Sequence, residues 1–371
     1  MANGEVLIIG GGAAGLATAS CLGRRGVAAR ILERGPAVGN SWANAYDRVR
    51  LHTGKHLSNL PNLPMGRDYP LYVARDQLVR YLRDYARRMD LAVETNERVL
   101  AVERAPGGGW RVTSDRAVRL APAVVVATGS FDNPVIPPFP GLDAFGGPIL
   151  HTADYRNPAS LAGRRVLVVG AGNSGAEIAV ELADAGREVA VAIRGGINIV
   201  PRDLLGFLPV QYLGYLLRRL PPRLARPIAA RTEARGARRL RAVGIPKAAH
   251  SMLDEVPVIG LDLLDRVKRG RIAVRGGVAR LAPGRVTFAD GREEGYAPVV
   301  DFLRPLADNP VSLVPPVGVA CPSEPGLYFV GMHRTTQGLL YLVSRHEAPE
   351  VARRIVERLA SWQVGGLQVA G

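Results

Sequence analysis

Two short, continuous apolar runs in the chain are each followed by a glycine-rich turn. Val6–Ile9 is the first run, and GGGAAG follows it at residues 10–15. Val166–Val169 is the second run, and GAGNSG follows it at residues 170–175. Continuous apolar runs of this length are typical of strands covered on both faces. Each run therefore predicts a buried strand, with a helix after the turn and a second strand beyond that helix.

The remaining pattern predicts further strands that alternate with helices. Apolar and aromatic residues recur at helical spacing from about Ala74 to Met89, which predicts an amphipathic helix. Further strands are expected at residues 124–127 and 327–331 and near Ile272, Val286 and Val299, with a closing helix at Pro349–Ala360. This alternation predicts an α/β fold with two Rossmann-like dinucleotide-binding domains, each with three layers (ββα).

The two glycine turns have the spacing G-x-G-x-x-G. With 43 glycines in 371 residues the spacing alone is weak evidence, so its place between strand and helix carries the argument. The first glycine makes the turn, the second lets the backbone approach a pyrophosphate, and the third lets the helix pack on the strand. Phosphates then meet free N–H groups at the positive end of the helix. We predict two dinucleotide sites, formed by Gly10, Gly12 and Gly15 and by Gly170, Gly172 and Gly175; the alternative is that these glycines serve packing only.

The second strand of each unit ends in a different polar residue. Glu33 can accept hydrogen bonds from ribose hydroxyls, which suits FAD or NAD. Arg194 stands at the corresponding position of the second unit, and a guanidinium there suits the 2′-phosphate of NADPH. The alternative for Arg194 is a solvated arginine on the surface of an arginine-rich protein.

Composition narrows the function classes further. The net charge of +15 is compatible with nucleic acid, an anionic membrane or an anionic cofactor. No nucleic-acid recognition module or basic-aromatic pattern accompanies it, so we expect no nucleic-acid partner. Cys21 and Cys321 are far apart in the sequence and form no C-x-x-C pair, and no secretory signal is visible, so a cytoplasmic location is expected.

Residues 204–217 are the most apolar segment, but they are too few to cross a bilayer and contain Pro209. We therefore expect no transmembrane segment. The segment is interpreted as a core or interface helix at the start of a helical insertion at about residues 203–250; a helix at a membrane surface and a substrate-access lid are the alternatives.

A longer motif, Phe145-x-Gly147-x-x-x-His151-x-x-x-Tyr155-Arg156, lies between the two turns. With YDRVRLHTGKHLSNLP at residues 46–61, GAGNSGAE at 170–177 and GLYFVG at 326–331, it makes the chain resemble the flavin-containing monooxygenases, in particular the plant YUCCA-type indole-3-pyruvate monooxygenases and their bacterial relatives. The resemblance implies an NADPH domain (residues 146–298) inserted into an FAD domain (residues 1–145 and 299–371).

The resemblance also implies the reaction. NADPH reduces FAD, dioxygen adds to the flavin as a hydroperoxide, and this adduct oxygenates a 2-oxo acid, an amine or a sulfide. The partners are therefore dioxygen and a small-molecule substrate, while the oligomeric state stays open. Most of the chemistry belongs to the cofactor, so few acid–base side chains are expected.

Individual site residues follow from the same resemblance. His52 is expected to line the oxygen site, with a structural loop histidine as the alternative. His52 and His56 are not expected to form a metal site, because no acidic residue accompanies them. His151 and Tyr155 are expected to order the linker. The other residues implied to bind the cofactors are Trp42, Thr128, Gly129, Asn173, Ser174, Gly331, Gln337 and Gly338.

The chain departs from the family at one place. A second A-T-G-Y/F segment is expected after the NADPH domain, but Val299-Val300-Asp301 runs directly into Phe302-Leu303-Arg304. This leaves open an NADPH-dependent flavin reductase or oxidase that inserts no oxygen, and also a non-catalytic flavoprotein. A flavin disulfide reductase would need a redox-active cysteine pair, which Cys21 and Cys321 do not supply.

Replacement of Arg194 tests the assignment of the second site. Arg194→Ala removes a charged contact worth about 1.5–3 kcal/mol, so the KM for NADPH should rise about 10- to 100-fold while the KM for NADH stays unchanged. Steady-state kinetics with both coenzymes measure this, with Arg292→Ala as the control. Equal effects on the two coenzymes would contradict the assignment.

Overall fold

The computed structural model describes residues 4–129, 134–296, 299–301, 319–333 and 338–367, and the chain divides into two compact units. Unit 1 is built from Met1–Ala43, Thr53–Asn133 and Asn309–Gly371. Unit 2 is built from Asn44–His52 and Pro134–Asp308. The short segment Asn44–His52 therefore leaves unit 1 in the middle of its sequence and folds with unit 2.

Unit 1 contains a five-stranded parallel sheet in the order β20-β7-β1-β2-β3. Its strands are β1 (Val6–Ile9), β2 (Ala29–Leu32), β3 (Ala92–Glu94), β7 (Val124–Val126) and β20 (Leu327–Phe329). In the register, Leu7 lies opposite Val124 on one side, and Val6 lies opposite Ala29 on the other. The two strands predicted around the first glycine turn are thus confirmed as neighbours in the sheet.

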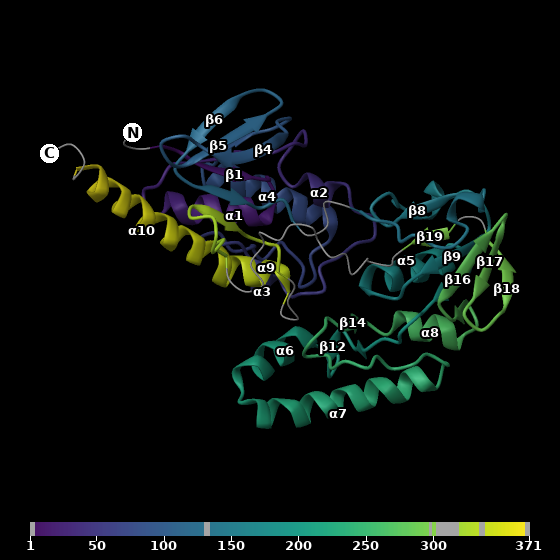
Figure 1. The fold of residues 1–371 in the computed structure, drawn as a ribbon. Coiled ribbons are helices and arrows are strands. Elements are labelled where there is room, and N and C mark those ends of the chain that lie inside the picture. The colour runs from purple at the N-terminus through teal and green to yellow at the C-terminus, as the bar shows by residue number, and fades with distance from the viewer. Residues whose placement is uncertain (1–3, 130–133, 297–298, 302–318, 334–337, 368–371) are drawn as a thin grey trace. The chain divides into compact units, whose positions relative to one another are not determined.

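Each face of this sheet is covered by a different layer. A three-stranded antiparallel sheet covers one face, where Leu7 and Leu32 pack against Trp110 and Val112. It consists of β4 (Val99–Arg104), β5 (Trp110–Ser114) and β6 (Val118–Ala121). Because side chains alternate along a strand, Val6 and Ile8 point to the opposite face. There α1 (Ala13–Gly23) lies, with α10 (Ala348–Leu367) packed along it (Figure 1).

The predicted amphipathic helix is α4 (Arg75–Arg88), and it belongs to unit 1. Its buried face carries Leu78, Tyr81, Leu82 and Tyr85. Two of these phenols are also satisfied by hydrogen bonds, since Tyr81 donates to the carbonyl of Leu63 and Tyr85 to that of Pro61.

Unit 2 repeats the same architecture. Its parallel sheet has the order β15-β10-β9-β19-β8. The strands are β8 (Ile149–His151), β9 (Arg165–Val169), β10 (Glu188–Ala192), β15 (Ile272–Arg275) and β19 (Val299–Asp301). The predicted boundary of the NADPH domain ends at residue 298, whereas β19 pairs within this sheet.

Alternating side chains of β9 separate the two layers that cover this sheet. Val166 and Val168 pack toward α5 (Asn173–Asp184) and α8 (Asp262–Lys268). Leu167 and Val169 pack toward an antiparallel sheet of β16 (Val278–Ala282), β17 (Arg285–Phe288) and β18 (Glu293–Gly295). Both units therefore have the predicted three-layer ββα fold.

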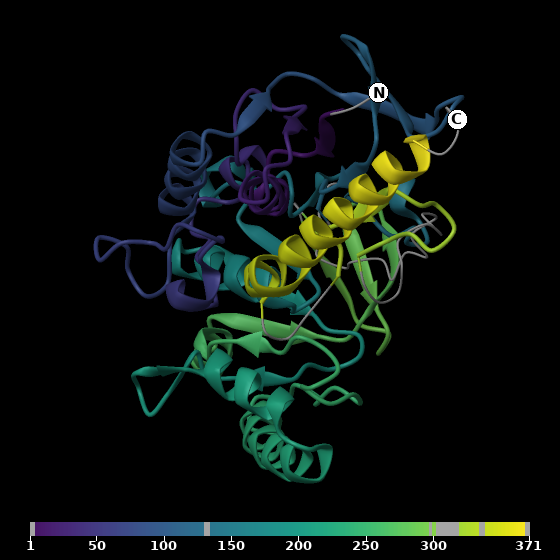
Figure 2. The same ribbon diagram turned by 90° about the vertical axis from the view of Figure 1, so that its left-hand side faces the viewer.

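The segment from residue 204 is not one helix, so that expectation was wrong. Strands β12 (Asp203–Leu204) and β13 (Leu208–Pro209) form a hairpin, and α6 (Val210–Arg219) and α7 (Pro222–Arg241) follow it. Leu205 and Gly206 have left-handed backbones (φ 55° and 81°), which ends any regular helix there. The two helices lie side by side (Figure 1 and Figure 2). Among the described residues, no helix is long and apolar enough to span a membrane.

The remaining elements are short. They are α2 (Asn40–Ala43), α3 (Lys55–Ser58), β11 (Ile199–Val200), β14 (Val258–Ile259), α9 (Leu339–Leu342), the π-helix η3 (Val343–Glu347) and two 3-10 turns, η1 (Leu142–Ala144) and η2 (Pro158–Ser160). Residues 302–318, where the second A-T-G segment would stand, lie outside the described residues, and so does Gln337.

Candidate dinucleotide-binding sites

The first glycine turn is fixed by close backbone contacts. The N–H of Gly10 donates to the carbonyl of Leu32 at 2.8 Å, which joins the turn to the end of β2. Gly10 has a φ of 110°, and a Cβ there would lie 2.6 Å from the carbonyl oxygen of Ala127. A Cβ on Gly15 would lie 2.0 Å from the carbonyl oxygen of Gly10. Only glycine fits at these two positions, because the helix must start directly against the strand.

Gly12 differs from its neighbours, since a Cβ there would meet no atom within 4 Å. Gly12 is the N-cap of α1, whose first N–H groups have no intrahelical partner. Open space in front of a positive helix end is what a pyrophosphate group requires. The residues at this turn therefore fit a dinucleotide such as FAD.

Glu33 lies against the same turn, next to Gly11, and is 8% exposed. Its two carboxylate oxygens accept hydrogen bonds from the N–H groups of Gly11 and Gly35, each at 2.6 Å. These bonds orient the carboxylate at the end of β2, and each oxygen keeps a further lone pair. A ribose hydroxyl could use it, so the predicted role of Glu33 is compatible with the geometry.

Other predicted residues of unit 1 gather at the same edge of the sheet. The segment that carries Thr128 and Gly129 follows β7 and passes directly over Gly10. A Cβ on Gly331, after β20, would lie 2.9 Å from that of Ala14. Trp42 is half-buried in α2, which is tied to the turn by the bond from the N–H of Gly39 to the carbonyl of Gly11. Gly338 is the N-cap of α9, with a φ of 99°.

A buried carboxylate at this edge escaped the sequence analysis. Glu347 is 5% exposed, and its Oε2 accepts a hydrogen bond from the N–H of Gly331 at 2.7 Å. Its Oε1 lies 2.8 Å from Nδ1 of His333. Glu347 ends the π-helix η3, and insertions of this kind are frequent at functional sites. The local sequence gives no signal for Glu347, because η3 also carries Ser344, Arg345 and His346.

The second glycine turn repeats the first in unit 2. The N–H of Gly170 donates to the carbonyl of Ala192 at 2.8 Å, and Gly170 has a φ of 94°. Gly172 is exposed and is the N-cap of α5, while Gly175 is buried. The first turn of α5 carries no acidic side chain that would repel a phosphate.

The polar residues at and after the second turn differ in how far their side chains are exposed to solvent. Asn173 uses its side chain inside the protein: it accepts from the N–H of Ile259 at 2.7 Å and donates to the carbonyl of Pro257 at 3.0 Å. These two bonds hold the Asn173 side chain against the segment at 257–259, while Ser174 is half-exposed. Arg194 is exposed just beyond β10, and a Cβ on Gly277 would lie 3.3 Å from its Cβ and Cγ. A side chain at position 277 would therefore crowd Arg194.

His52 belongs to unit 2 and lies beside the helix that follows the second glycine turn. Its Nε2 lies 3.4 Å from Oε1 of Glu177 on α5, and it is 19% exposed. Tyr46 donates to Oε2 of the same carboxylate at 2.5 Å, and Arg202 lies 3.7 Å from Oε1. Glu177 thus links three residues that the sequence analysis did not connect. Glu177 stands two residues after the last glycine of the turn, and this position is the sequence feature from which its role could have been predicted.

Burial controls the protonation of this cluster. Desolvation, assisted by the charge of Arg202, lowers the pKa of His52 to about 4. Desolvation also raises the pKa of Glu177 above its usual value, against the stabilising hydrogen bond from Tyr46. His52 is therefore neutral at pH 7. Its Nδ1 is buried and has no hydrogen-bond partner.

The linker motif contributes two aromatic side chains to the core of unit 2. Phe145 and Tyr155 are fully buried, and Tyr155 donates to Oε2 of Glu181 at 2.8 Å. Gly147 lies against the Phe145 ring, and Nδ1 of His151 accepts from the N–H of Ala153. These contacts are those of an ordering role, as expected for His151 and Tyr155.

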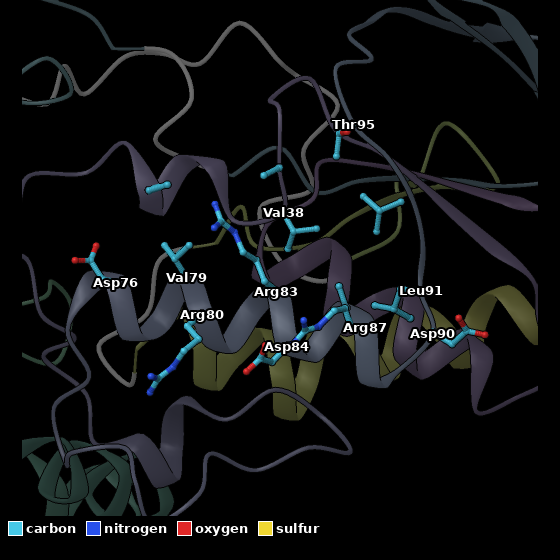
Figure 3. A pocket seen from close by; sticks show the side chains of 14 residues that line it. Val38, Asp76, Val79, Arg80, Arg83, Asp84, Arg87, Asp90, Leu91 and Thr95 are labelled. Carbon is cyan, nitrogen blue, oxygen red and sulfur yellow. Dashed lines mark hydrogen bonds and ion pairs between the residues drawn. The ribbon is translucent and has the colours of Figure 1, made fainter.

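Unit 1 also contains a cavity of about 830 Å³. It is formed by the loop after β2, by α2, β3 and one face of α4, from which Arg80, Arg83 and Arg87 project (Figure 3). Acidic residues of α4 share this lining, and Asp84 pairs with Arg87. None of the predicted cofactor residues lines it, so we assign it no ligand.

Comparison with known proteins gives three kinds of similarity. Residues 7–202 match the family model described as pyridine nucleotide-disulphide oxidoreductase. The indole-3-pyruvate monooxygenase YUCCA1 of Oryza sativa subsp. japonica is 36% identical over 79% of this chain and 75% of its own length. The flavin-containing monooxygenase of Stenotrophomonas maltophilia has a TM-score of 0.74 at 26% identity, covering 96% of this chain and 99% of that chain.

A more distant structure shares the fold alone. The crystal structure of OTEMO in complex with FAD and NADP has a TM-score of 0.74 at 17% identity, and covers 98% of this chain and 85% of that chain. The OTEMO structure contains FAD and NADP, and its fold is similar to that of this chain.

Two glycines of one turn should respond differently to a methyl group. Gly15→Ala should destabilise the protein by about 2 kcal/mol or more, because its Cβ collides with the Gly10 carbonyl. Gly12→Ala should fold with nearly unchanged stability but lose bound flavin, because its Cβ enters open space needed by the pyrophosphate. Thermal unfolding and the flavin absorbance of purified protein measure both effects.

Gly23→Ala, at the other end of α1, is the matched control, because its Cβ would also meet no atom within 4 Å. It should keep both stability and flavin. Full flavin content in Gly12→Ala would contradict the proposed use of this turn.

The buried imidazole of His52 should make stability fall in mild acid. An unfolded histidine has a pKa of about 6.5 and folded His52 one of about 4, so between these values the unfolded chain binds more protons. Stability contributed by neutral His52 is therefore complete above about pH 6.5 and is lost as the pH falls toward 4, by up to about 3 kcal/mol.

Denaturant unfolding from pH 7 to pH 4.5 measures this loss in the wild type and in His52→Gln, whose slope should be shallower. His56→Gln, at an exposed position, is the control and should follow the wild type. Superimposable curves for wild type and His52→Gln would refute a buried neutral imidazole.

Proposed function

The chain belongs to the flavin-dependent monooxygenases of the YUCCA type, which makes it an NADPH- and FAD-dependent oxidoreductase, and we propose that it oxygenates a small 2-oxo acid. The observation that carries the two-cofactor part of this proposal is the pair of glycine turns that differ in the residue after the second strand, Glu33 in one and Arg194 in the other. The relative of 36% identity is named for indole-3-pyruvate, an aromatic 2-oxo acid.

The proposed reaction balances with one equivalent of each reactant. A 2-oxo acid, dioxygen, NADPH and one proton give the carboxylic acid shorter by one carbon, carbon dioxide, NADP⁺ and water. One oxygen atom enters the organic product and the other leaves as water. An amine or a sulfide would instead accept the oxygen atom without losing carbon.

Unit 1 is proposed to hold FAD. The open space at Gly12 and the N–H groups of α1 would bind the pyrophosphate, and Glu33 would bind the ribose. Thr128, Gly129, Gly331 and Trp42 lie around the same turn, and Gln337 and Gly338 complete the proposed set. When bound, FAD supplies the chemistry, accepting electrons from NADPH and delivering them to dioxygen.

Unit 2 is proposed to hold NADPH. The N–H groups at the start of α5 would bind its pyrophosphate, and the exposed Arg194 would bind the 2′-phosphate. Gly277 leaves room for the arginine side chain. His52 is proposed to line the oxygen site, and its imidazole is neutral at pH 7.

A disulfide reductase, the activity in the name of the matching family model, is not supported. Cys21 and Cys321 are both buried and free. Burial raises the pKa of Cys21 to about 11, so its thiol stays protonated and is a poor nucleophile.

Two free thiols support a reducing cytoplasm as the location. Peripheral contact with a membrane also belongs to the proposal, and residues 204–231 supply the surface for it.

Oxygen insertion tests the proposed reaction. The FAD-loaded protein is supplied with NADPH, isotope-labelled dioxygen and an aromatic 2-oxo acid, and NADPH consumed, peroxide released and product formed are measured. We expect one labelled oxygen atom in the carboxylic acid per NADPH, with little peroxide. His52→Ala in the same assay should release more peroxide per NADPH, and unchanged coupling would contradict its role.

The alternatives give different results in that assay. NADPH consumption with one peroxide per NADPH and no labelled product, across 2-oxo acids, amines and sulfides, would identify a flavin oxidase and overturn the proposal. No reduction by NADPH would indicate a non-catalytic flavoprotein. Labelled amine or sulfide product would correct the substrate class alone.

A further inference from the structure

The hairpin and helices after residue 203 combine apolar exposure with positive charge. The described residues include eleven exposed large apolar side chains, and six of them lie between positions 205 and 228. They are Leu205, Phe207, Leu208, Leu216, Leu224 and Ile228. From Leu204 to Thr232 the chain has no aspartate or glutamate and five arginines: Arg218, Arg219, Arg223, Arg226 and Arg231. Single exposed apolar residues need no explanation, but a cluster with one sign of charge does.

The apolar side chains at the tip of the hairpin are largely exposed to solvent. Leu205 is 86% exposed and Phe207 is 71% exposed. The pairing of Leu204 with Leu208 holds the turn, and Leu205 has the left-handed φ of 55°. A leucine in this conformation is held against its backbone preference, while its side chain gains no burial within unit 2. The local fold therefore fixes two large apolar groups in water.

These groups are not the unfinished core of the helical pair. Val210, Leu217, Ala225, Ala229 and Met252 already form a small buried cluster of their own. Leu224 and Ile228, one turn apart on α7, point away from that cluster and are exposed. The exposed residues thus lie outside the packed interior of this helix pair.

Charge distinguishes the partners that could cover this face. Arg223, Arg226 and Arg231 are exposed on α7, beside Leu224 and Ile228. A second copy would bring the same arginines against each other across a two-fold interface, without acidic partners from this segment. An anionic bilayer is complementary to both properties of this segment. Its phosphates can bind the guanidinium groups, and its acyl boundary can take up the exposed leucine and phenylalanine side chains.

We propose that residues 204–231 are a docking surface for an anionic phospholipid bilayer, in which Leu205 and Phe207 enter the acyl boundary and the arginines of α6 and α7 bind lipid phosphates. This deepens the peripheral contact within the proposed function and concerns unit 2 alone. Such a contact is reversible and interfacial, and its strength depends on both apolar area and anionic lipid content.

Vesicle co-sedimentation of the FAD-loaded full chain tests the proposal. One set of vesicles contains phosphatidylcholine alone and the other about 30% phosphatidylserine, the anionic lipid of such surfaces. We expect binding to the anionic vesicles only, with release at high salt. The double variant Leu205→Ser/Phe207→Ser and the double variant Arg223→Gln/Arg226→Gln should each reduce the bound fraction about tenfold or more.

A matched control is available in unit 1. Val118 and Leu120 on β6 are 61% and 59% exposed, and Val118→Ser/Leu120→Ser should bind vesicles like the wild type. Equal loss in this control, or equal binding to both kinds of vesicle, would overturn the proposal.

The oligomeric state and activity separate the other outcomes. A wild-type dimer in solution that Leu205→Ser/Phe207→Ser converts to monomer would assign the face to a second copy and overturn the membrane proposal. Vesicle binding needs no turnover. Intact oxygenation without vesicle binding therefore overturns this inference alone, and vesicle binding without oxygenation overturns only the proposed reaction.

Discussion

One hydrogen bond, made twice, sets the geometry of both proposed nucleotide sites. It joins the first glycine of each turn to the end of the second strand, from Gly10 to Leu32 and from Gly170 to Ala192. The bond requires a backbone that turns sharply at the end of the first strand, with a φ of 110° at Gly10 and 94° at Gly170. The helix must then start so close to the strand that no Cβ fits at Gly15. The free N–H groups of the helix therefore face open space at the edge of the sheet.

The sequence predicted this part of the structure well, because the features involved are local. A buried strand, a turn that only glycine can make and a helix of small residues are each visible within about 25 residues of pattern. The same holds for α4, whose buried tyrosines and leucines recur at helical spacing. The difference between Glu33 and Arg194 could also be read directly, because each follows its strand at a fixed position.

Features that depend on distant parts of the chain could not be predicted. The Glu177 carboxylate joins Tyr46 and His52 across more than a hundred positions, and no local pattern indicates such a pairing. The side chain of Asn173, placed in the nucleotide site by resemblance, is occupied by backbone groups of residues 257–259. The apolar run at 204–217 predicts one helix, but only its part from Val210 onward is helical, because hydrophobicity alone does not distinguish a helix from a hairpin whose turn is left-handed at Leu205.

The position of β20 in the sheet has a consequence for how the chain folds during synthesis. Its partner β7 is made about two hundred residues earlier, and Leu327 lies opposite Val124 in the finished sheet. At roughly 5–20 residues per second, β7 waits on the order of tens of seconds with one edge unpaired while residues 134–308 of unit 2 are translated. Unpaired strand edges invite pairing with other chains, so the ribosome-bound protein passes through an aggregation-prone interval. Unit 2, by contrast, has every strand of its described residues by Asp301 and can fold before unit 1 is complete.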